Sequence, residues 1–111
     1  MANDFKRFCV PSVGTSNTTL YTVPGSSKES IVIGITMANK STAGITASIF
    51  IDNEDGSNDV FIVKDATIPA GTSLEVMSGN KLVLQNDGTN ADNLEAIASA
   101  TSSLDVTVSV L

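Results

Sequence analysis

The chain has 111 residues, a formal net charge of −6 at pH 7, one cysteine and no histidine. A chain of this length buries roughly two-thirds of the surface that it exposes when unfolded, so we expect one domain over residues 1–111. Its six basic residues are scattered except for one adjacent pair, and binding to phosphate backbones requires clustered positive charge. These features argue against a nucleic-acid partner and against an intrachain disulfide.

Neither a secretory leader nor a membrane span is expected. The first residues lack the apolar stretch of a signal peptide. No run approaches the roughly 18 apolar residues that a membrane helix requires. We therefore expect synthesis in a cytoplasm and no membrane partner.

Alternation of apolar and polar residues with a period of two recurs along the chain, and this is typical of half-buried strands. Proline and glycine at residues 24–25 and 69–71 separate such segments. Short strands at this spacing predict an all-β fold, a single antiparallel two-sheet β-sandwich (Ig-like or jelly-roll) with eight to nine strands. Residues 1–17 would form an N-terminal arm or an edge strand. In chain order the expected strands are 5–10, 18–23, 31–37, 45–51, 60–64, 73–77, 81–85, 94–100 and 104–110.

The connections predict three hairpins between strands adjacent in sequence. These pair residues 31–37 with 45–51, 73–77 with 81–85, and 94–100 with 104–110. The first of these strands is apolar on both sides, with Ile31, Ile33, Ile35 and Met37 on one face. It is therefore expected to be central and covered on both faces. A short helix at 94–100 is the competing interpretation of its alanines.

The inventory of side chains predicts no catalytic residue and no cofactor. Without histidine the usual general base of serine and cysteine nucleophiles is missing, as is the commonest metal ligand. Cys9 lies in a predicted strand, where a small packed residue is the expected role. The carboxylates fall mostly in loops, where solvated charge is the ordinary explanation. We therefore expect that the protein is not an enzyme.

Two acidic loops offer weaker alternatives. Oxygen ligands around Gly56 suggest a calcium site, but aligning that glycine with an EF-hand loop puts Ile51 and Ile62 at required ligand positions. A polar hairpin loop is the favoured interpretation, with no metal. The second loop, residues 86–93, is a connection that would bind a ligand only as a lesser alternative. The calcium candidates are Asp52, Asn53, Asp55 and Asp59.

The pattern of strands and turns resembles short virion structural proteins of tailed bacteriophages. The likeness covers about residues 18–111 and is most characteristic at LYTVP (20–24), IPAG (68–71) and SSLDVTVSVL (102–111). The family has a tighter turn after the strand that reads LVLQ here, so the longer loop at 86–93 departs from it. The resemblance implies a structural component of the particle, of the decoration or tail-accessory type.

The function expected from this resemblance is a capsid decoration, or cement, protein that binds the assembled shell. A tail, neck, baseplate or fibre-associated subunit is the alternative, and a module that binds glycans or a host surface is the third. Expected partners are other virion proteins, either the major capsid protein or tail and neck proteins. Several symmetric copies would act together. The protein would reside in the virion after synthesis in the host cytoplasm.

The candidate interface is at the N-terminal end, where the adjacent basic pair lies between two aromatic residues. Its residues are Phe5, Lys6, Arg7 and Phe8. A basic arm there could dock on an acidic shell. The terminal strands, 5–10 and 104–111, could also add to a neighbour's sheet by strand pairing.

Overall fold

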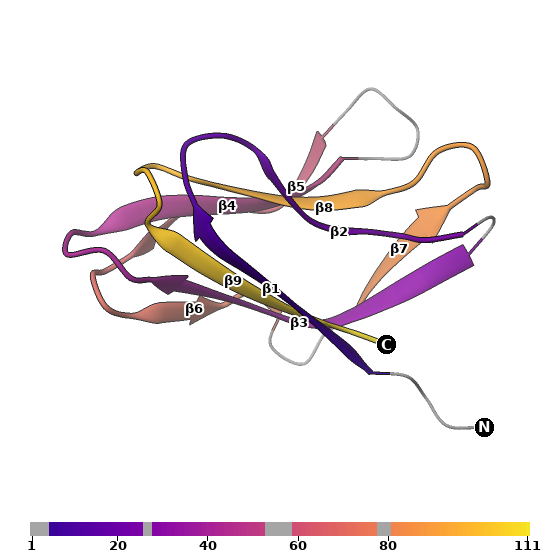
Figure 1. The fold of residues 1–111 in the computed structure, drawn as a ribbon, viewed down its shortest axis with the longest axis horizontal. Coiled ribbons are helices and arrows are strands. Elements are labelled where there is room, and N and C mark those ends of the chain that lie inside the picture. The colour runs from indigo at the N-terminus through magenta and orange to yellow at the C-terminus, as the bar shows by residue number, and fades with distance from the viewer. Residues whose placement is uncertain (1–4, 26–27, 53–58, 78–80) are drawn as a thin grey trace.

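The structure is a computed structural model that describes residues 5–25, 28–52, 59–77 and 81–111. This part of the chain forms nine strands and no helix (Figure 1), so the all-β prediction is confirmed and the alternative helix at 94–100 is wrong. The strands are β1 (Lys6–Val13), β2 (Thr18–Thr22), β3 (Lys28–Asn39), β4 (Ile45–Asp52), β5 (Asp59–Ile68), β6 (Ser73–Glu75), β7 (Leu82–Asn86), β8 (Asn93–Ala98) and β9 (Leu104–Val110).

The strands form two antiparallel sheets that pack as a sandwich. The first has the order β1-β9-β3-β6, and β7 also pairs with β3; the second has the order β2-β8-β4-β5. Figure 1 shows the two layers, with β1, β9 and β3 in one and β2, β8 and β4 in the other. The apolar core lies between them, because one face of each sheet is buried against the other.

The three predicted hairpins are wrong. β3 and β4 lie in opposite sheets, as do β8 and β9, while β6 and β7 each pair with a different stretch of β3. Turn residues show that the chain reverses direction, but a reversed strand can either pair with its predecessor or cross to the other layer. The connection at 78–80 lies outside the described residues. β4 and β5 do pair directly, as expected for the strands that flank the acidic loop.

β3 is central, as predicted, but a bulge changes which of its residues face the core. Val32 lies opposite Val110 and Gly34 lies opposite Ser109, so Ile33 is an additional residue. The alternation shifts there, and the fully buried side chains of β3 are Val32, Ile35 and Met37 rather than a run of odd-numbered residues. The expectation that both faces are covered is wrong, because only one face packs on the second sheet.

Asn39, at the end of β3, is a buried polar residue that ties three segments together. Its side-chain amide donates hydrogen bonds to the carbonyl oxygens of Ala43 and Ile68, both at 2.9 Å. Its side-chain oxygen accepts from the backbone N–H and the hydroxyl of Ser41. Its backbone exchanges hydrogen bonds with Gly71 and Thr72. This residue therefore fixes the β3–β4 connection against the turn that follows β5.

Replacing Asn39 by alanine should destabilise the fold by about 2–3 kcal/mol, because the carbonyl of Ile68 in a buried hydrogen bond and the carbonyl of Ala43 in a part-buried one lose their donors. The midpoint of urea unfolding measures this change. Asn90→Ala is the matched control, since the bonds found at Asn90 use only its backbone. Equal midpoints for both variants would show that the network around Asn39 adds nothing to stability.

Candidate binding edge

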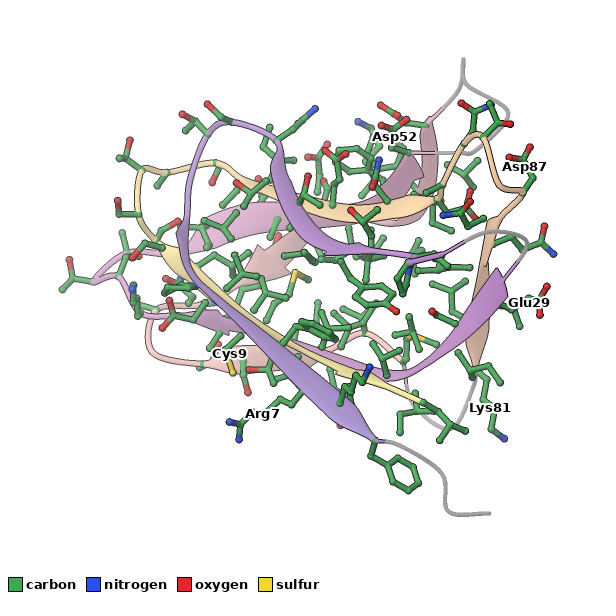
Figure 2. The ribbon with its side chains drawn as sticks, turned by 45° about the vertical axis from the view of Figure 1, so that its right-hand side comes forward. Arg7, Cys9, Glu29, Asp52, Lys81 and Asp87 are labelled. Carbon is green, nitrogen blue, oxygen red and sulfur yellow. The ribbon has the colours of Figure 1, made fainter. Side chains whose placement is uncertain are left out.

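β1 is an edge strand whose side chains divide between two faces. Phe8 lies opposite the fully buried Val108 and packs against the core, so it faces the second sheet together with Lys6. Figure 2 shows Arg7 and Cys9 on the outward side of the strand. Cys9 is exposed, and the expectation that it is packed is therefore wrong.

The backbone of β9 indicates which groups of β1 are already paired. Leu111 and Ile31 exchange two hydrogen bonds, of 2.8 and 3.4 Å. Hydrogen-bonding direction alternates along an antiparallel strand, so odd-numbered residues of β9 bond to β3. Its even-numbered residues, Val106, Val108 and Val110, therefore bond to β1.

Their partners in β1 are Lys6, Phe8 and Val10. The N–H and C=O groups of Arg7 and Cys9 consequently point away from the sheet. In the described part of the chain no strand pairs with this side of β1. We call residues 6–10 the β1 edge.

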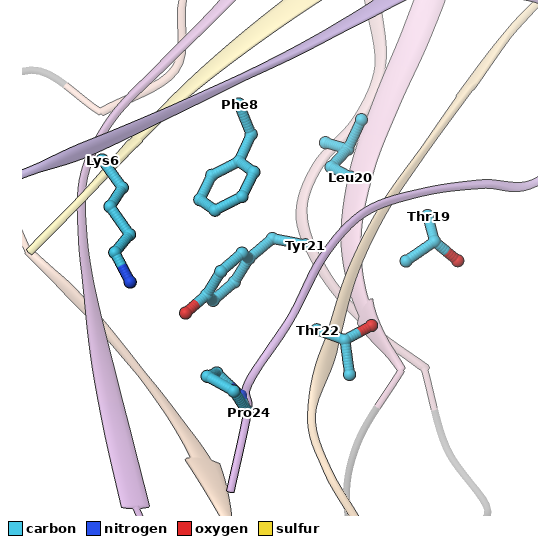
Figure 3. Close-up of a pocket in the computed structure, with 7 residues that line it drawn as sticks. All are labelled: Lys6, Phe8, Thr19, Leu20, Tyr21, Thr22 and Pro24. Carbon is cyan, nitrogen blue, oxygen red and sulfur yellow. The ribbon is translucent and has the colours of Figure 1, made fainter.

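A groove with a volume of about 360 Å³ lies between the β1 edge and β2 (Figure 3). The ring centroids of Phe8 and Tyr21 are 4.9 Å apart, with the rings tilted by 52°. The Tyr21 hydroxyl is 2.7 Å from the hydroxyl oxygen of Ser30, which fixes the ring. The groove is thus mainly apolar, with one ammonium group at its border. Its lining residues are Lys6, Phe8, Thr19, Leu20, Tyr21, Thr22 and Pro24.

The regular part of the edge ends after Val10. Pro11 lacks an N–H group, and Ser12 adopts a positive φ of 59°. The Ser12 N–H donates to a carboxylate oxygen of Asp105 at 2.9 Å, and the Lys40 ammonium lies 2.9 Å from the same oxygen. The hydrogen bonds from Lys40 and then Ser12 lower the pKa of Asp105. These contacts stabilise the irregular segment between Val10 and Val13, where the register of β1 against β9 shifts.

The other sheet edges are shorter or interrupted. β5 has two irregularities against β4, one of them at Asp65, whose φ is 51° and whose N–H donates to the hydroxyl of Ser48. β2 has a register shift, β6 is three residues long, and Gln85 of β7 exchanges hydrogen bonds with Asp92 on its outer side. Bulges and short strands oppose further pairing. Among the described strands, β1 therefore offers the longest regular unpaired edge.

The structure divides the four predicted interface residues. Phe5 precedes β1 with 68% of its surface exposed, Lys6 and Phe8 line the groove, and Arg7 lies on the opposite face. Sequence reasoning missed Tyr21 and Pro24, because no local pattern shows that β2 lies beside β1. The C-terminal strand was a wrong candidate for strand addition, since β9 pairs on both sides.

The calcium candidates are only partly within the described residues. Asp52 lies opposite Asp59 at the ends of β4 and β5, whereas Asn53 and Asp55 lie outside the described residues. Within the described part, no three His, Cys, Asp or Glu side chains form a group suited to a metal ion. The calcium alternative therefore stays untested.

Polar side chains of the acidic loop at 86–93 form hydrogen bonds within the loop and to the strands beside it. One carboxylate oxygen of Asp87 accepts from the N–H groups of Thr89 and Asn90, at 2.8 and 2.7 Å. The bonds from Asn90 and then Thr89 lower the pKa of Asp87. The Asn86 side chain donates to the carbonyl of Val23, which ties the loop to the end of β2. These hydrogen bonds hold the shape of the loop, and the lesser alternative that the loop binds a ligand stays a prediction.

Glu95 lies opposite Phe50 on the second sheet and is partly desolvated. Desolvation, followed by repulsion from Asp52 and Asp59, raises the pKa of Glu95. A carboxyl group with a raised pKa in the folded state binds its proton more tightly when folded. Its charge therefore opposes folding at neutral pH, and this penalty disappears as the pH falls to the ordinary value and below.

Glu95→Gln should accordingly raise the melting temperature at pH 7, and the gain should vanish below pH 4.5, the ordinary value for a glutamate. Thermal unfolding followed from pH 3 to 8 measures both effects. Glu29→Gln, at an exposed position of β3, removes the same charge and is the control. A gain that does not depend on pH would contradict the electrostatic explanation.

Comparisons with known proteins assign the chain to no family. No protein-family model and no curated protein sequence matches the chain. Two solved chains are similar to it, from structures of infectious bursal disease virus strains Gx and Gt, with 14% and 18% identity and a TM-score of 0.45 each. The alignments cover 96% and 97% of this chain but 33% and 31% of the viral chains. At this TM-score the likeness carries no functional argument.

The described part of the chain contains no helix that is long and apolar enough to cross a membrane.

Proposed function

We propose that the chain is a non-enzymatic structural protein of a tailed-bacteriophage particle and that it decorates the assembled shell. The observation that carries this proposal is the β1 edge, which pairs with β9 on one side, has no partner strand on the other side in the described part of the chain, and carries the adjacent Lys6 and Arg7. Such an edge suits binding to another protein surface. The resemblance of residues 18–111 to small virion proteins points to the same class.

The chemistry of the groove favours binding over catalysis. Among the described residues that line the groove, Lys6 is the one ionisable side chain besides the phenol of Tyr21, whose hydroxyl is hydrogen-bonded to Ser30. General acid–base catalysis depends on titratable groups within reach of one another, and the chain has no histidine to supply one.

Symmetry explains how a small edge would be sufficient. An assembled shell presents many equivalent sites, so a modest contact is repeated over the particle. The net charge of −6 would oppose association between copies in solution. Local positive charge at the β1 edge would then direct binding toward an acidic surface.

The aromatic side chains fit a glycan-binding role less well. Phe50 and Phe61 contact each other at 5.2 Å between ring centroids, and the Lys64 ammonium lies 4.6 Å above the ring of Phe61. Phe8 and Tyr21 are likewise in mutual contact. Sugars stack on open ring faces. These contacts cover part of those faces and so reduce the ring surface on which a sugar could stack.

Cryo-electron microscopy of purified particles tests the proposal, with the chain located in the map and its copies counted. On the order of hundreds of copies arranged over the shell are expected for a decoration protein. A ring or small cluster on the tail axis would replace the proposal with the tail or neck alternative. Absence from the particle would overturn both virion roles, and a glycan-binding assay would follow.

A further inference from the structure

We propose that the partner extends the first sheet: an acidic, extended segment of the partner protein pairs with the β1 edge and seats an apolar side chain in the groove. This inference rests on the proposed function for the identity of the partner. It specifies how the partner is recognised.

The backbone provides the first argument. The N–H and C=O groups of Arg7 and Cys9 point outward, as the pairing of β9 requires. An added strand would therefore form up to four backbone hydrogen bonds with these two residues. The irregularity between Val10 and Val13 limits the paired segment to about five partner residues.

The groove provides the second argument. A strand added beyond β1 directs alternate side chains toward the second sheet, over the space between β1 and β2 that Figure 3 shows. The side chains that meet it there are Phe8, Tyr21 and Pro24. These present mainly apolar surface, and a volume of about 360 Å³ accommodates one aliphatic or aromatic side chain.

Charge provides the third argument and favours a different chain over a second copy. Lys6 and Arg7 lie on opposite faces of β1, so acidic residues on either face of the added strand would meet a cation. In a symmetric antiparallel pairing of two β1 edges that uses all four outward groups, Arg7 of one copy lies opposite Cys9 of the other. The two Arg7 side chains are then diagonal neighbours on one face, about 7–8 Å apart, and like charges at this spacing oppose the pairing. The partner segment is therefore acidic on both faces.

The test uses purified protein and particles prepared without it, with binding measured by co-sedimentation. Cys9→Pro removes an outward N–H and crowds the edge, without removing a bond to β9. We expect this variant to bind about tenfold more weakly or worse, as the loss of one or more hydrogen bonds implies, with its melting temperature retained.

Val83→Pro is the matched control. Val83, on β7, lies opposite Ile31 of β3, and because the backbone of Ile31 bonds to Leu111, the N–H of Val83 also points away from β3. This variant should bind like the unmodified protein. For charge, Lys6→Glu should weaken binding at low salt, while Lys81→Glu, which makes the same change on an exposed residue before β7, should not.

Hydrogen–deuterium exchange of the unmodified protein is a readout that requires no variant to fold. The amides of Arg7 and Cys9 should exchange quickly in the isolated protein and become protected on the particle. The amide of Phe8, already bonded to β9, should be protected in both states.

The outcomes separate the two proposals. If the unmodified protein does not bind particles, the proposed function fails. If it binds while Cys9→Pro binds equally well and the two amides stay unprotected, strand addition is overturned and the proposed function stands. If the isolated protein forms dimers that Cys9→Pro abolishes, a second copy occupies the edge and the inferred acidic partner is wrong.

Discussion

The structure depends on the burial of one apolar core between the two sheets, to which both sheets contribute side chains. Each sheet has an apolar face that must be covered by the opposite sheet, because these side chains would otherwise be exposed to water. β9, which lies between β1 and β3 in the first sheet, meets this requirement most regularly. Its buried side chains are Leu104, Val106, Val108 and Val110. Because no described strand pairs with the other side of β1, β1 forms the edge of that sheet.

The same requirement explains which parts of the fold could be predicted from the sequence. Alternation is local, so the strands and the sandwich class were predictable from segments such as 104–110. Strand partners depend on contacts between residues distant in sequence, and a turn between β8 and β9 is compatible with a hairpin or a crossing. The bulge at Ile33 was also beyond prediction, because it depends on how β3 fits β9 and not on β3 itself.

The candidate site was predictable to the same extent. The basic pair at Lys6 and Arg7 stands out in an acidic chain, and a strand there was expected. That the two residues face opposite ways follows from the strand period, but that β1 is unpaired on one side follows only from the sheet order. Tyr21 enters the groove from β2, and its position depends on the packing of the two sheets.

An unpaired edge is a hazard for any β protein, because it can pair with other chains indiscriminately. On β5 the bulge at Asp65 counters this hazard, and β6 does so by its short length. β1 has no such interruption over residues 6–10, and it carries positive charge on both faces. Charge of one sign repels a second copy of the same edge while attracting an acidic strand. The charge that would oppose self-association through β1 is therefore the same charge that would select its partner.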